Sequence, residues 1–342
     1  MTNDVEIIGI DLAKNTFQLH GLDKEGGTVF RRKINRSRLL EFVSTFEPCL
    51  IAMEACGGAH YWAREFQSLG HQVRLIHPTY VRPFVKRQKN DAADAEAIAE
   101  AASRPSMRFV PIKSAERQAQ SMLLKTRDLL NSQRTQTINA LRGHMTEQGI
   151  VVPKGPANVR RIEEALSKCA EKLPEQTIKL SRLLIEKIYE ITEEISSLTK
   201  EIKRLAENDE VTKRLMTIPG IGPICAVTIA VLAPDPESFR RGRDFSAWAG
   251  LTPRQFSTGG KARLGRISKM GQKDLRRLLV LGATSLIKYV DRDQSSLRNS
   301  WFIRLLERKP RKVAAVAMAN KMARMAWAIM RFKEIYRDPV AV

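Results

Sequence analysis

Between residues 114 and 206 the sequence carries no strand signal, and this stretch rules out a single α/β domain for the whole chain. The segment "SAERQAQSMLLKTRDLLNSQRTQTINALRGHMTEQG" keeps apolar residues at helical spacing for many turns and stops at a glycine. After the loop "VVPKGPANV", a second long segment repeats the pattern. It places apolar residues at steps of three or four, with charged residues between them: Leu180, Leu183, Leu184, Ile188, Ile191, Ile195, Leu198, Ile202 and Leu205. We therefore expect a helical hairpin or coiled coil that acts as a spacer or an oligomerisation element.

Residues 1–110 are typical of an α/β domain. Short apolar or alternating runs with β-branched residues predict strands at "EIIGIDLA", "TFQLHGLD", "GTVFRRKIN", "CLIAMEA" and "HQVRLIHP". The turn residues "DKEGG" join the second and third strands, and helical spacing marks "SRLLEFVSTF", "AHYWAREFQSLG" and "DAADAEAIAEAAS". Strands joined by hairpins and then alternating with helices predict a mixed sheet flanked by helices.

Four carboxylates stand at the ends of these elements. Asp11 ends the first apolar strand, Glu54 ends the strand before "CGG", and Asp91 and Asp94 lie three apart on one face of a helix. If the two strands are neighbours, the acids meet and repel one another unless a cation neutralises them. Oxygen-only ligands suit Mg²⁺ or Mn²⁺, which in pairs clamp a phosphodiester during in-line displacement. Taken alone, Asp91 is better explained as the cap of its helix; the acids at the ends of apolar strands are what favour a metal site.

The net charge of +21 is concentrated in the last third of the chain. Residues 211–342 hold 26 basic and 9 acidic side chains, whereas residues 1–110 hold 15 and 13. A positive charge localised in this way usually meets a polyanion, above all nucleic acid, because each neutralised phosphate releases counterions. An anionic membrane surface is the alternative, but no amphipathic anchor or lipidation signal supports it.

The basic region opens with "IPGIGPICA", which matches the helix-hairpin-helix pattern. Gly220 and Gly222 would let the backbone approach a DNA phosphate, to which amides at the next helix N-terminus would donate. An ordinary glycine turn between core helices is the alternative.

Residues 252–277, "TPRQFSTGGKARLGRISKMGQKDLRR", form the most unusual stretch. A single acid accompanies eight basic residues: Arg254, Lys261, Arg263, Arg266, Lys269, Lys273, Arg276 and Arg277. A serine within such a loop could attack phosphorus while guanidinium groups stabilise the developing charge. From residue chemistry alone, a loop that only binds the nucleic-acid backbone is favoured, with the serine serving turn chemistry.

Taken in order, these motifs resemble the DEDD transposases of bacterial insertion sequences, the insertion-sequence-110 and 1111 group with the Piv-like DNA invertases. The resemblance rests on "IGIDLAKNTF", "AMEACGGAHYW", "KNDAADAEAIAEA", "IPGIGPICA", "FSAWAGLTPRQFSTGGK" and "GRISKMGQKDLRRLL". It covers nearly the whole chain. It implies a RuvC-like (ribonuclease H-type) domain over residues 1–110, a coiled-coil spacer over 111–209 and a mostly α-helical transposase domain over 210–342.

The resemblance also implies a nucleophilic serine and recombination guided by an RNA encoded beside the gene. We expect Ser257 to be the nucleophile, because a primary hydroxyl is less hindered, and Thr258 is the alternative. The expected reaction is DNA strand exchange, with Mg²⁺ or Mn²⁺ held by Asp11, Glu54, Asp91 and Asp94. Two other hypotheses are a RuvC-like metal-dependent junction nuclease without a covalent intermediate and a non-catalytic DNA-architectural protein.

The expected partners are donor and target DNA, a guide RNA and further copies of the chain in a homodimer or homotetramer, with no membrane partner.

The four cysteines form no C-x-x-C pair, and with five isolated histidines they argue against zinc and against a disulfide framework. We expect a bacterial cytoplasmic protein associated with the nucleoid.

Overall fold

The computed structural model describes residues 4–85, 91–291 and 301–337. Contacts within the chain divide it into two compact units, Met1–Gln118 and Ala119–Val342. The helical spacer and the basic C-terminal part both belong to the second unit. The finer division into three domains stays a prediction.

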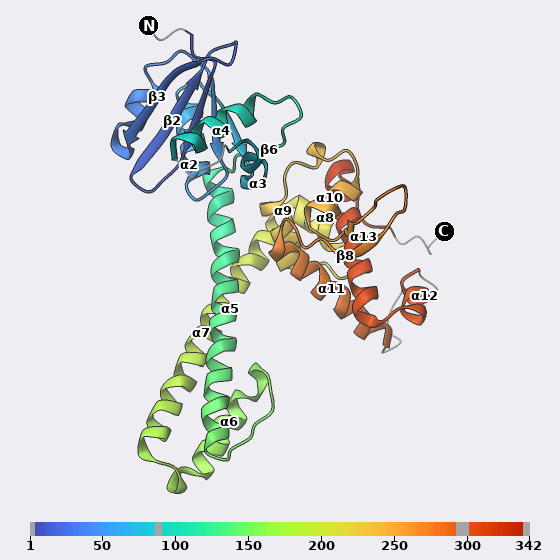
Figure 1. The fold of residues 1–342 in the computed structure, drawn as a ribbon. Coiled ribbons are helices and arrows are strands. Elements are labelled where there is room, and N and C mark those ends of the chain that lie inside the picture. The colour runs from blue at the N-terminus through green and yellow to red at the C-terminus, as the bar shows by residue number, and fades with distance from the viewer. Residues whose placement is uncertain (1–3, 86–90, 292–300, 338–342) are drawn as a thin grey trace. The chain divides into compact units, whose positions relative to one another are not determined.

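The first unit is built on a six-stranded sheet (Figure 1). Its strands are β1 (Ile7–Asp11), β2 (Thr16–Leu22), β3 (Thr28–Asn35), β4 (Leu50–Glu54), β5 (Gln72–Ile76) and β6 (Phe109–Val110), in the order β3-β2-β1-β4-β5-β6. The pairs β1–β4 and β4–β5 are parallel, and the other pairs are antiparallel. The mixed sheet flanked by helices is therefore confirmed. The helices of this unit are α1 (Leu39–Val43), α2 (Ala59–Ser68), α3 (Pro78–Val81) and α4 (Asp91–Ser103).

Each face of the sheet has its own apolar core. Ile8 and Ile10 of β1 pack on the face covered by α2, together with Phe17, Trp62 and Phe66. Ile7 packs on the opposite face, among the buried alanines of α4. Because side chains alternate along a strand, Gly9 and Asp11 follow Ile7 onto the α4 face. The same alternation places Glu54 on that face, since Ala52 packs with α4 and Met53 packs with α2.

Helix α4 approaches β1 unusually closely because small residues meet where the two cross. A Cβ atom added at Gly9 would lie 2.3 Å from the carbonyl oxygen of Ala95 and 2.7 Å from the amide nitrogen of Ala99. Only glycine leaves room for the helix backbone here, and the alanine-rich sequence of α4 supplies the matching surface. The contact holds Ala95, and with it the preceding residue Asp94, over the end of the sheet.

The second unit begins within the long helix α5 (Ala115–Glu147) and continues through α6 (Val159–Lys168) to α7 (Glu175–Asn208). Helices α5 and α7 run antiparallel, because residues further along α5 contact residues earlier in α7. Arg127 Nε donates to Thr199 Oγ1 at 2.8 Å, and Ser181 Oγ donates to Met145 Sδ at 3.6 Å. The periodic apolar positions Ile188, Ile191, Ile195 and Ile202 are buried. Leu180 and Leu183 are exposed instead (51% and 60%), and supercoiling of the pair stays a prediction.

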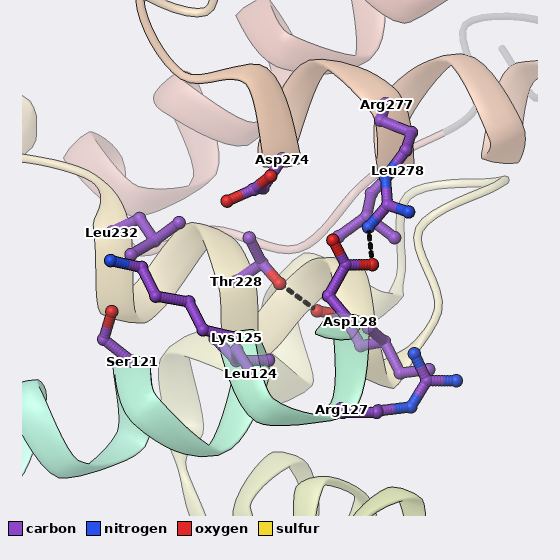
Figure 2. Close-up of a pocket in the computed structure, with 11 residues that line it drawn as sticks. Ser121, Leu124, Lys125, Arg127, Asp128, Thr228, Leu232, Asp274, Arg277 and Leu278 are labelled. Atoms are coloured by element: carbon purple, nitrogen blue, oxygen red, sulfur yellow. Dashed lines mark hydrogen bonds and ion pairs between the residues drawn. The ribbon is translucent and has the colours of Figure 1, made fainter. Parts of the chain in front are cut away.

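The spacer helices join the C-terminal helices at a small cavity of about 90 Å³ between α5, α9 (Pro223–Leu232) and α11 (Lys273–Asp291). Leu123 and Leu124 of α5 pack against Val227 and Val231 of α9. Figure 2 shows Asp128 of α5 paired with Arg277 of α11 across this junction. The beginning of α11 is thus fastened to the spacer by an ion pair.

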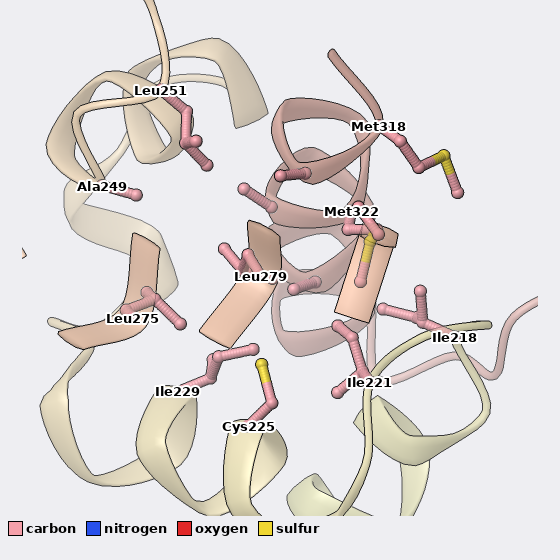
Figure 3. Packing of buried hydrophobic residues seen from close by; sticks show 14 of the residues in the cluster. Ile218, Ile221, Cys225, Ile229, Ala249, Leu251, Leu275, Leu279, Met318 and Met322 are labelled. Carbon is pink, nitrogen blue, oxygen red and sulfur yellow. The ribbon is translucent and has the colours of Figure 1, made fainter. Parts of the chain in front are cut away.

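The C-terminal part is mostly helical, as expected from the sequence. Besides α9 and α11 it contains α8 (Glu210–Met216), α10 (Gly242–Trp248), α12 (Trp301–Arg308) and α13 (Arg311–Phe332), with a small antiparallel sheet of β7 (Pro253–Gln255) and β8 (Leu264–Ile267). Leu275 and Leu279 of α11 pack between α9 and the alanine- and methionine-rich face of α13 (Figure 3). Within the described ranges, the helices are all too short or too polar to cross a membrane.

We expect substitution of Gly9 by alanine to loosen α4, because the added methyl group would overlap backbone atoms that cannot move aside without displacing the helix. Overpacking of this kind costs roughly 1–3 kcal/mol. Amides of α4 should therefore exchange with deuterium about 5- to 150-fold faster. A matched control is Gly57→Ala, which adds a methyl group in open space. Unchanged exchange in α4 of the Gly9→Ala protein would contradict the packing argument.

Candidate active site and nucleic-acid interface

Three of the four predicted carboxylates belong to one edge of the sheet. Asp11 and Glu54 end the adjacent parallel strands β1 and β4, whose register pairs Ile10 with Met53. Both acids lie on the α4 face, and both are partly buried. Asp94 lies in the first turns of α4, directly before the close contact at Gly9. Helix α4 begins at Asp91, whose side chain, with any capping role, lies outside the described residues.

The electrostatics of this edge reflect crowded negative charge. Burial, followed by the negative charge of Asp94, raises the pKa of Glu54, while His77 opposes the shift. Burial also raises the pKa of the Cys56 thiol, and the charges of Glu54 and Asp11 add to this effect. The carboxylates at the ends of β1 and β4 and at the start of α4 are thus close enough to shift the pKa values of groups at this edge.

Cys56 and His77 are neighbours of the acids that the sequence did not single out. His77 follows β5 directly, as Asp11 and Glu54 close β1 and β4, so its place after a parallel strand was a usable signal. Its Nδ1 atom accepts a hydrogen bond from the amide of Thr79 at 3.3 Å, which makes it the N-cap of α3.

The donor set at this edge suits a hard divalent cation. Its acids offer only oxygen atoms, the ligands that Mg²⁺ and Mn²⁺ prefer. Among the side chains that the structure describes, a set that excludes Asp91, no three histidine, cysteine or acidic residues form a complete metal-binding group.

Ser257 lies in a β-hairpin, whereas the sequence predicts a loop there. Strands β7 and β8 pair over residues 253–267, and Thr258 and Lys261 form a further bridge around the tight turn Gly259-Gly260. Both turn glycines have positive φ angles, 55° and 76°, which explains why glycine is required there. Ser257 and Thr258 are exposed, and Ser257 Oγ accepts a hydrogen bond from Gln255 Nε2 at 2.8 Å. The Ser257 hydroxyl proton therefore remains free to be donated.

The basic residues of this stretch fall into two groups. Lys261, Arg263, Arg266, Lys269 and Lys273 are exposed on the hairpin and its return to α11. The guanidinium of Arg254 instead donates to the Ser268 carbonyl at 3.2 Å. Arg276 donates to the carbonyls of Ala249 and Met270 at 3.0 and 3.1 Å, and Arg277 pairs with Asp128. The second group fastens the hairpin to the helices, and the first group is available to a phosphate backbone.

The motif "IPGIGPICA" forms the turn between α8 and α9, and its two glycines have different surroundings. Gly220, at φ +86°, packs against α11 so closely that a Cβ atom on Gly282 would lie 2.0 Å from the Gly220 carbonyl oxygen. Gly222 is exposed, stands at the N-terminus of α9 and has open space around its Cα atom. Of the two, Gly222 is the one placed to approach a phosphate.

Two family models match the chain. The model described as "Transposase IS116/IS110/IS902 family" covers residues 212–298, and a DEDD transposase model of the IS110 type, described as "Transposase", covers residues 8–149. The chain is 47% identical to a "Putative transposase y4pF/y4sB" of Sinorhizobium fredii over 97% of its own length and 85% of the relative's. It is 43% identical to the "Transposase for insertion sequence element IS1328" of Yersinia enterocolitica, covering 95% and 97% of the two chains. A "Pilin gene-inverting protein" of Moraxella lacunata is 24% identical over 95% of each.

The sheet with its acidic edge, followed by a helical part with a basic hairpin, defines a DNA-recombining enzyme of the transposase class. More narrowly, the chain belongs to the IS110 family of insertion-sequence transposases, with relatives among the pilin gene-inverting proteins. Its DEDD-type domain is of a metal-dependent kind. The expected resemblance is thus confirmed, and DNA is the substrate.

Reactivity of Cys56 offers a test of the carboxylate edge. Because the charges of Glu54 and Asp11 help to raise the pKa of this thiol, Glu54→Gln or Asp11→Asn should lower that pKa. The thiolate fraction near pH 8 should then rise, and alkylation of Cys56 by iodoacetamide should accelerate roughly two- to tenfold. Peptide mass mapping with time gives the rate, and Glu47→Gln, on an exposed acid of the same unit, is the control. Equal rates in all four proteins would mean that the two acids do not act on Cys56.

Proposed function

We propose that this chain cuts and rejoins DNA strands by transient covalent attachment of DNA to Ser257, assisted by a divalent-cation site made of Asp11, Glu54, Asp91 and Asp94. The observation that carries the proposal is the acidic edge itself. Two adjacent parallel strands end in acids on one face, and a helix held against that face by Gly9 brings Asp94 to the same edge. The charge of Asp94 helps to raise the pKa of Glu54, which supports a shared neighbourhood for these carboxylates.

In the proposed site, Asp11, Glu54, Asp91 and Asp94 bind Mg²⁺ or Mn²⁺. Such a cation, when bound, would offset the carboxylate charge, orient the scissile phosphate and stabilise the negative charge of its transition state. The proposal assigns the acids this binding role and assigns nucleophilic attack to the hairpin.

The covalent step exchanges one phosphodiester for another. Ser257 Oγ forms a bond to phosphorus while the bond from phosphorus to one strand oxygen breaks. The serine proton is lost and the departing oxygen gains a proton, so the strand leaves as a free hydroxyl. Because the phosphoserine diester keeps the bond energy, a strand hydroxyl can later attack it and restore a DNA phosphodiester without an added energy source. This reversibility separates a recombinase from a hydrolytic nuclease.

Ser257 is supported as the nucleophile by its place on an exposed hairpin beside basic side chains. Its hydroxyl accepts from Gln255, which fixes its orientation and leaves its proton to be given up. Arg263, Arg266 and Lys261 are exposed on the same hairpin and would stabilise negative charge on the phosphate. Lys269, Lys273 and Gly222 extend the proposed backbone contacts, whereas Arg254 and Gly220 are used within the fold and contribute by positioning.

The acids and the hairpin serine belong to different units of the chain. We include in the proposal that protomers of a homodimer or homotetramer share active sites, one supplying acids and another supplying the serine. The exposed leucines of α7 are consistent with helix pairing between copies.

We expect Ser257→Ala to abolish a covalent protein–DNA adduct, because no other hydroxyl would replace the lost nucleophile. Denaturing electrophoresis of the protein with radiolabelled substrate DNA and Mn²⁺ measures the adduct. Thr258→Ala, which changes the neighbouring hydroxyl on the same hairpin, is the matched control and should retain it. Loss of the adduct in Thr258→Ala alone would assign the reaction to Thr258. Strand cleavage by wild-type protein without any adduct would favour the junction nuclease.

The same variants test shared active sites. Asp11→Asn should bind DNA and fail to recombine it, which also excludes a purely architectural protein. A mixture of the Asp11→Asn and Ser257→Ala proteins should recover part of the lost recombination if protomers share sites. As a control, each variant must fold and must assemble with wild-type protein. If the mixture then still fails to recombine DNA, the acids and the serine of each active site lie on one chain.

We also propose that target choice depends on an RNA of the element's own locus. Among the described helices none is a clear base-reading element, the hairpin presents backbone-binding charge, and base pairing with RNA can supply sequence information instead. Recombination in vitro should therefore need that RNA, and RNase treatment should abolish it. A scrambled RNA of equal length is the control. Efficient site-specific recombination by RNA-free protein would refute this part and indicate a direct-readout helix, for example α13.

A further inference from the structure

A surface hollow of about 690 Å³ lies at the carboxylate end of the sheet, on the face opposite α4. Its lining comes from three segments that start or end at this edge: Asn15 before β2, Asn35 and Arg36 at the end of β3 and directly after it, and Tyr61 and Trp62 of α2. Asn15 follows Asp11 by four residues and Tyr61 follows Glu54 by seven, so short chain segments connect the hollow to the acids. The volume falls within the roughly 300–1,000 Å³ typical of ligand sites.

Two flat surfaces line this hollow. The Tyr61 ring is 42% exposed and meets the Trp62 ring edge-on, with centroids 5.3 Å apart. The guanidinium carbon of Arg36 lies 5.1 Å from the Trp62 ring centroid and covers an indole that is otherwise buried. A planar ligand can stack on a tyrosine ring, and it can equally stack on a guanidinium plane that is itself stacked on tryptophan.

Hydrogen-bonding groups surround the flat surfaces. The side-chain amides of Asn15 and Asn35 have no hydrogen-bond partner within the part of the chain that the structure describes. The backbone amide of Arg36 donates to the carbonyl of Asn15 at 2.9 Å, so the two segments are held together while their side chains stay available. Each amide offers a donor and an acceptor, which matches the edge of a nucleobase.

The rim of the hollow is positively charged. Lys14, Arg36 and Arg38 are all exposed within this short region. A nucleotide presents a planar base, hydrogen-bonding edges and an anionic phosphate, and the hollow offers a partner to each. A base inside a duplex is stacked on its neighbours, so only an unpaired or extruded base could use these planar surfaces.

We propose that the hollow binds an unpaired base of the DNA strand whose phosphate lies at the carboxylate edge. The inference rests on the proposed function, because it places the base next to the strand being cut. DNA is preferred over RNA as the occupant because two of the three segments that line the hollow continue from β1 and β4, the strands that end in Asp11 and Glu54. Arg36 and Tyr61 hold the base and do not enter the covalent step.

Photo-crosslinking of the full-length protein tests this assignment. The probe is an oligodeoxythymidine with one 5-iodo-deoxyuridine, which crosslinks to aromatic side chains in contact with the base under near-ultraviolet light. Trypsin cuts after Arg38 and Arg64, so the crosslink should appear on the peptide 39–64, at Tyr61. We expect the yield to fall tenfold or more in Tyr61→Ala and to recover in Tyr61→Phe, which keeps the ring. Tyr189→Ala, at a spacer tyrosine of similar exposure (44%), should leave it unchanged.

A pair of arginine variants separates stacking from charge. Arg36→Lys keeps the charge but removes the plane, and we expect it to lower the Tyr61 crosslink severalfold. Arg38→Ala removes a neighbouring charge without a stacked ring and should lower it less. This variant also loses a trypsin site, so its crosslinked peptide is 37–64. Crosslinks found only outside peptide 39–64, or a yield that follows charge alone, would overturn the proposal. A stronger Tyr61 crosslink with the matching 5-iodouridine RNA would overturn the assignment to DNA.

The same assay distinguishes failure of this inference from failure of the proposed function. Ser257→Ala should still crosslink through Tyr61, because base binding does not need the nucleophile. If the adduct is absent in wild-type protein but the Tyr61 crosslink persists, covalent chemistry is wrong and the base site stands. If the adduct forms and Tyr61 does not crosslink, the base site is wrong.

Discussion

The contact between α4 and β1 at Gly9 is the interaction on which the acidic edge depends. A strand pair alone brings Asp11 and Glu54 together, but it leaves the α4 face open. Because Gly9 has no side chain and Ala95 and Ala99 have small ones, the helix backbone reaches the strand itself. Dense packing of this kind allows little sliding, so the position of Asp94 along the edge is set by the crossing point. The raised pKa of Glu54 agrees with this position of Asp94, since burial and the negative charge of Asp94 both raise it.

Much of this edge could be predicted from the sequence, and the reason is local. Asp11 and Glu54 end apolar strands, and a short apolar run predicts both that a buried strand forms and where it ends. The pairing of β1 with β4 needs long-range information, because β2, β3 and α1 separate the two strands along the chain. The crossing of α4 was not predictable in this way, because alanine periodicity does not say which face of which strand a helix covers. His77 could have been found from its place directly after the parallel strand β5, the same signal that marks Asp11 and Glu54.

The C-terminal hairpin shows the opposite case, in which local signals were weak although the fold is specific. Its strands are short, polar and exposed, so they lack the alternation that marks a half-buried strand. Backbone contacts instead fix its base: a Cβ atom on Gly250 would lie 2.0 Å from the Met270 carbonyl oxygen, and one on Gly271 would lie 1.9 Å from that of Trp248. Arg276 binds two carbonyls at the same place. Such contacts join segments about twenty residues apart, and no pattern within either segment reveals them.

On the proposed function, the acids and the basic hairpin serve one reaction together, and electrostatics gives the reason. A phosphodiester approaching several carboxylates is repelled, so the acidic edge cannot hold DNA without counter-charge. Exposed side chains such as Arg263 and Arg266 are accessible to a phosphate at little desolvation cost, whereas Arg276 and Arg277 are committed to carbonyl and carboxylate partners within the fold. On the proposed function, affinity for DNA therefore belongs to the basic hairpin and its surroundings, and the acidic edge is left to bind a cation. On the proposed function, a phosphate reacts only where the acidic edge and the basic hairpin both act on it. The acidic edge alone therefore does not cut every DNA strand that it encounters.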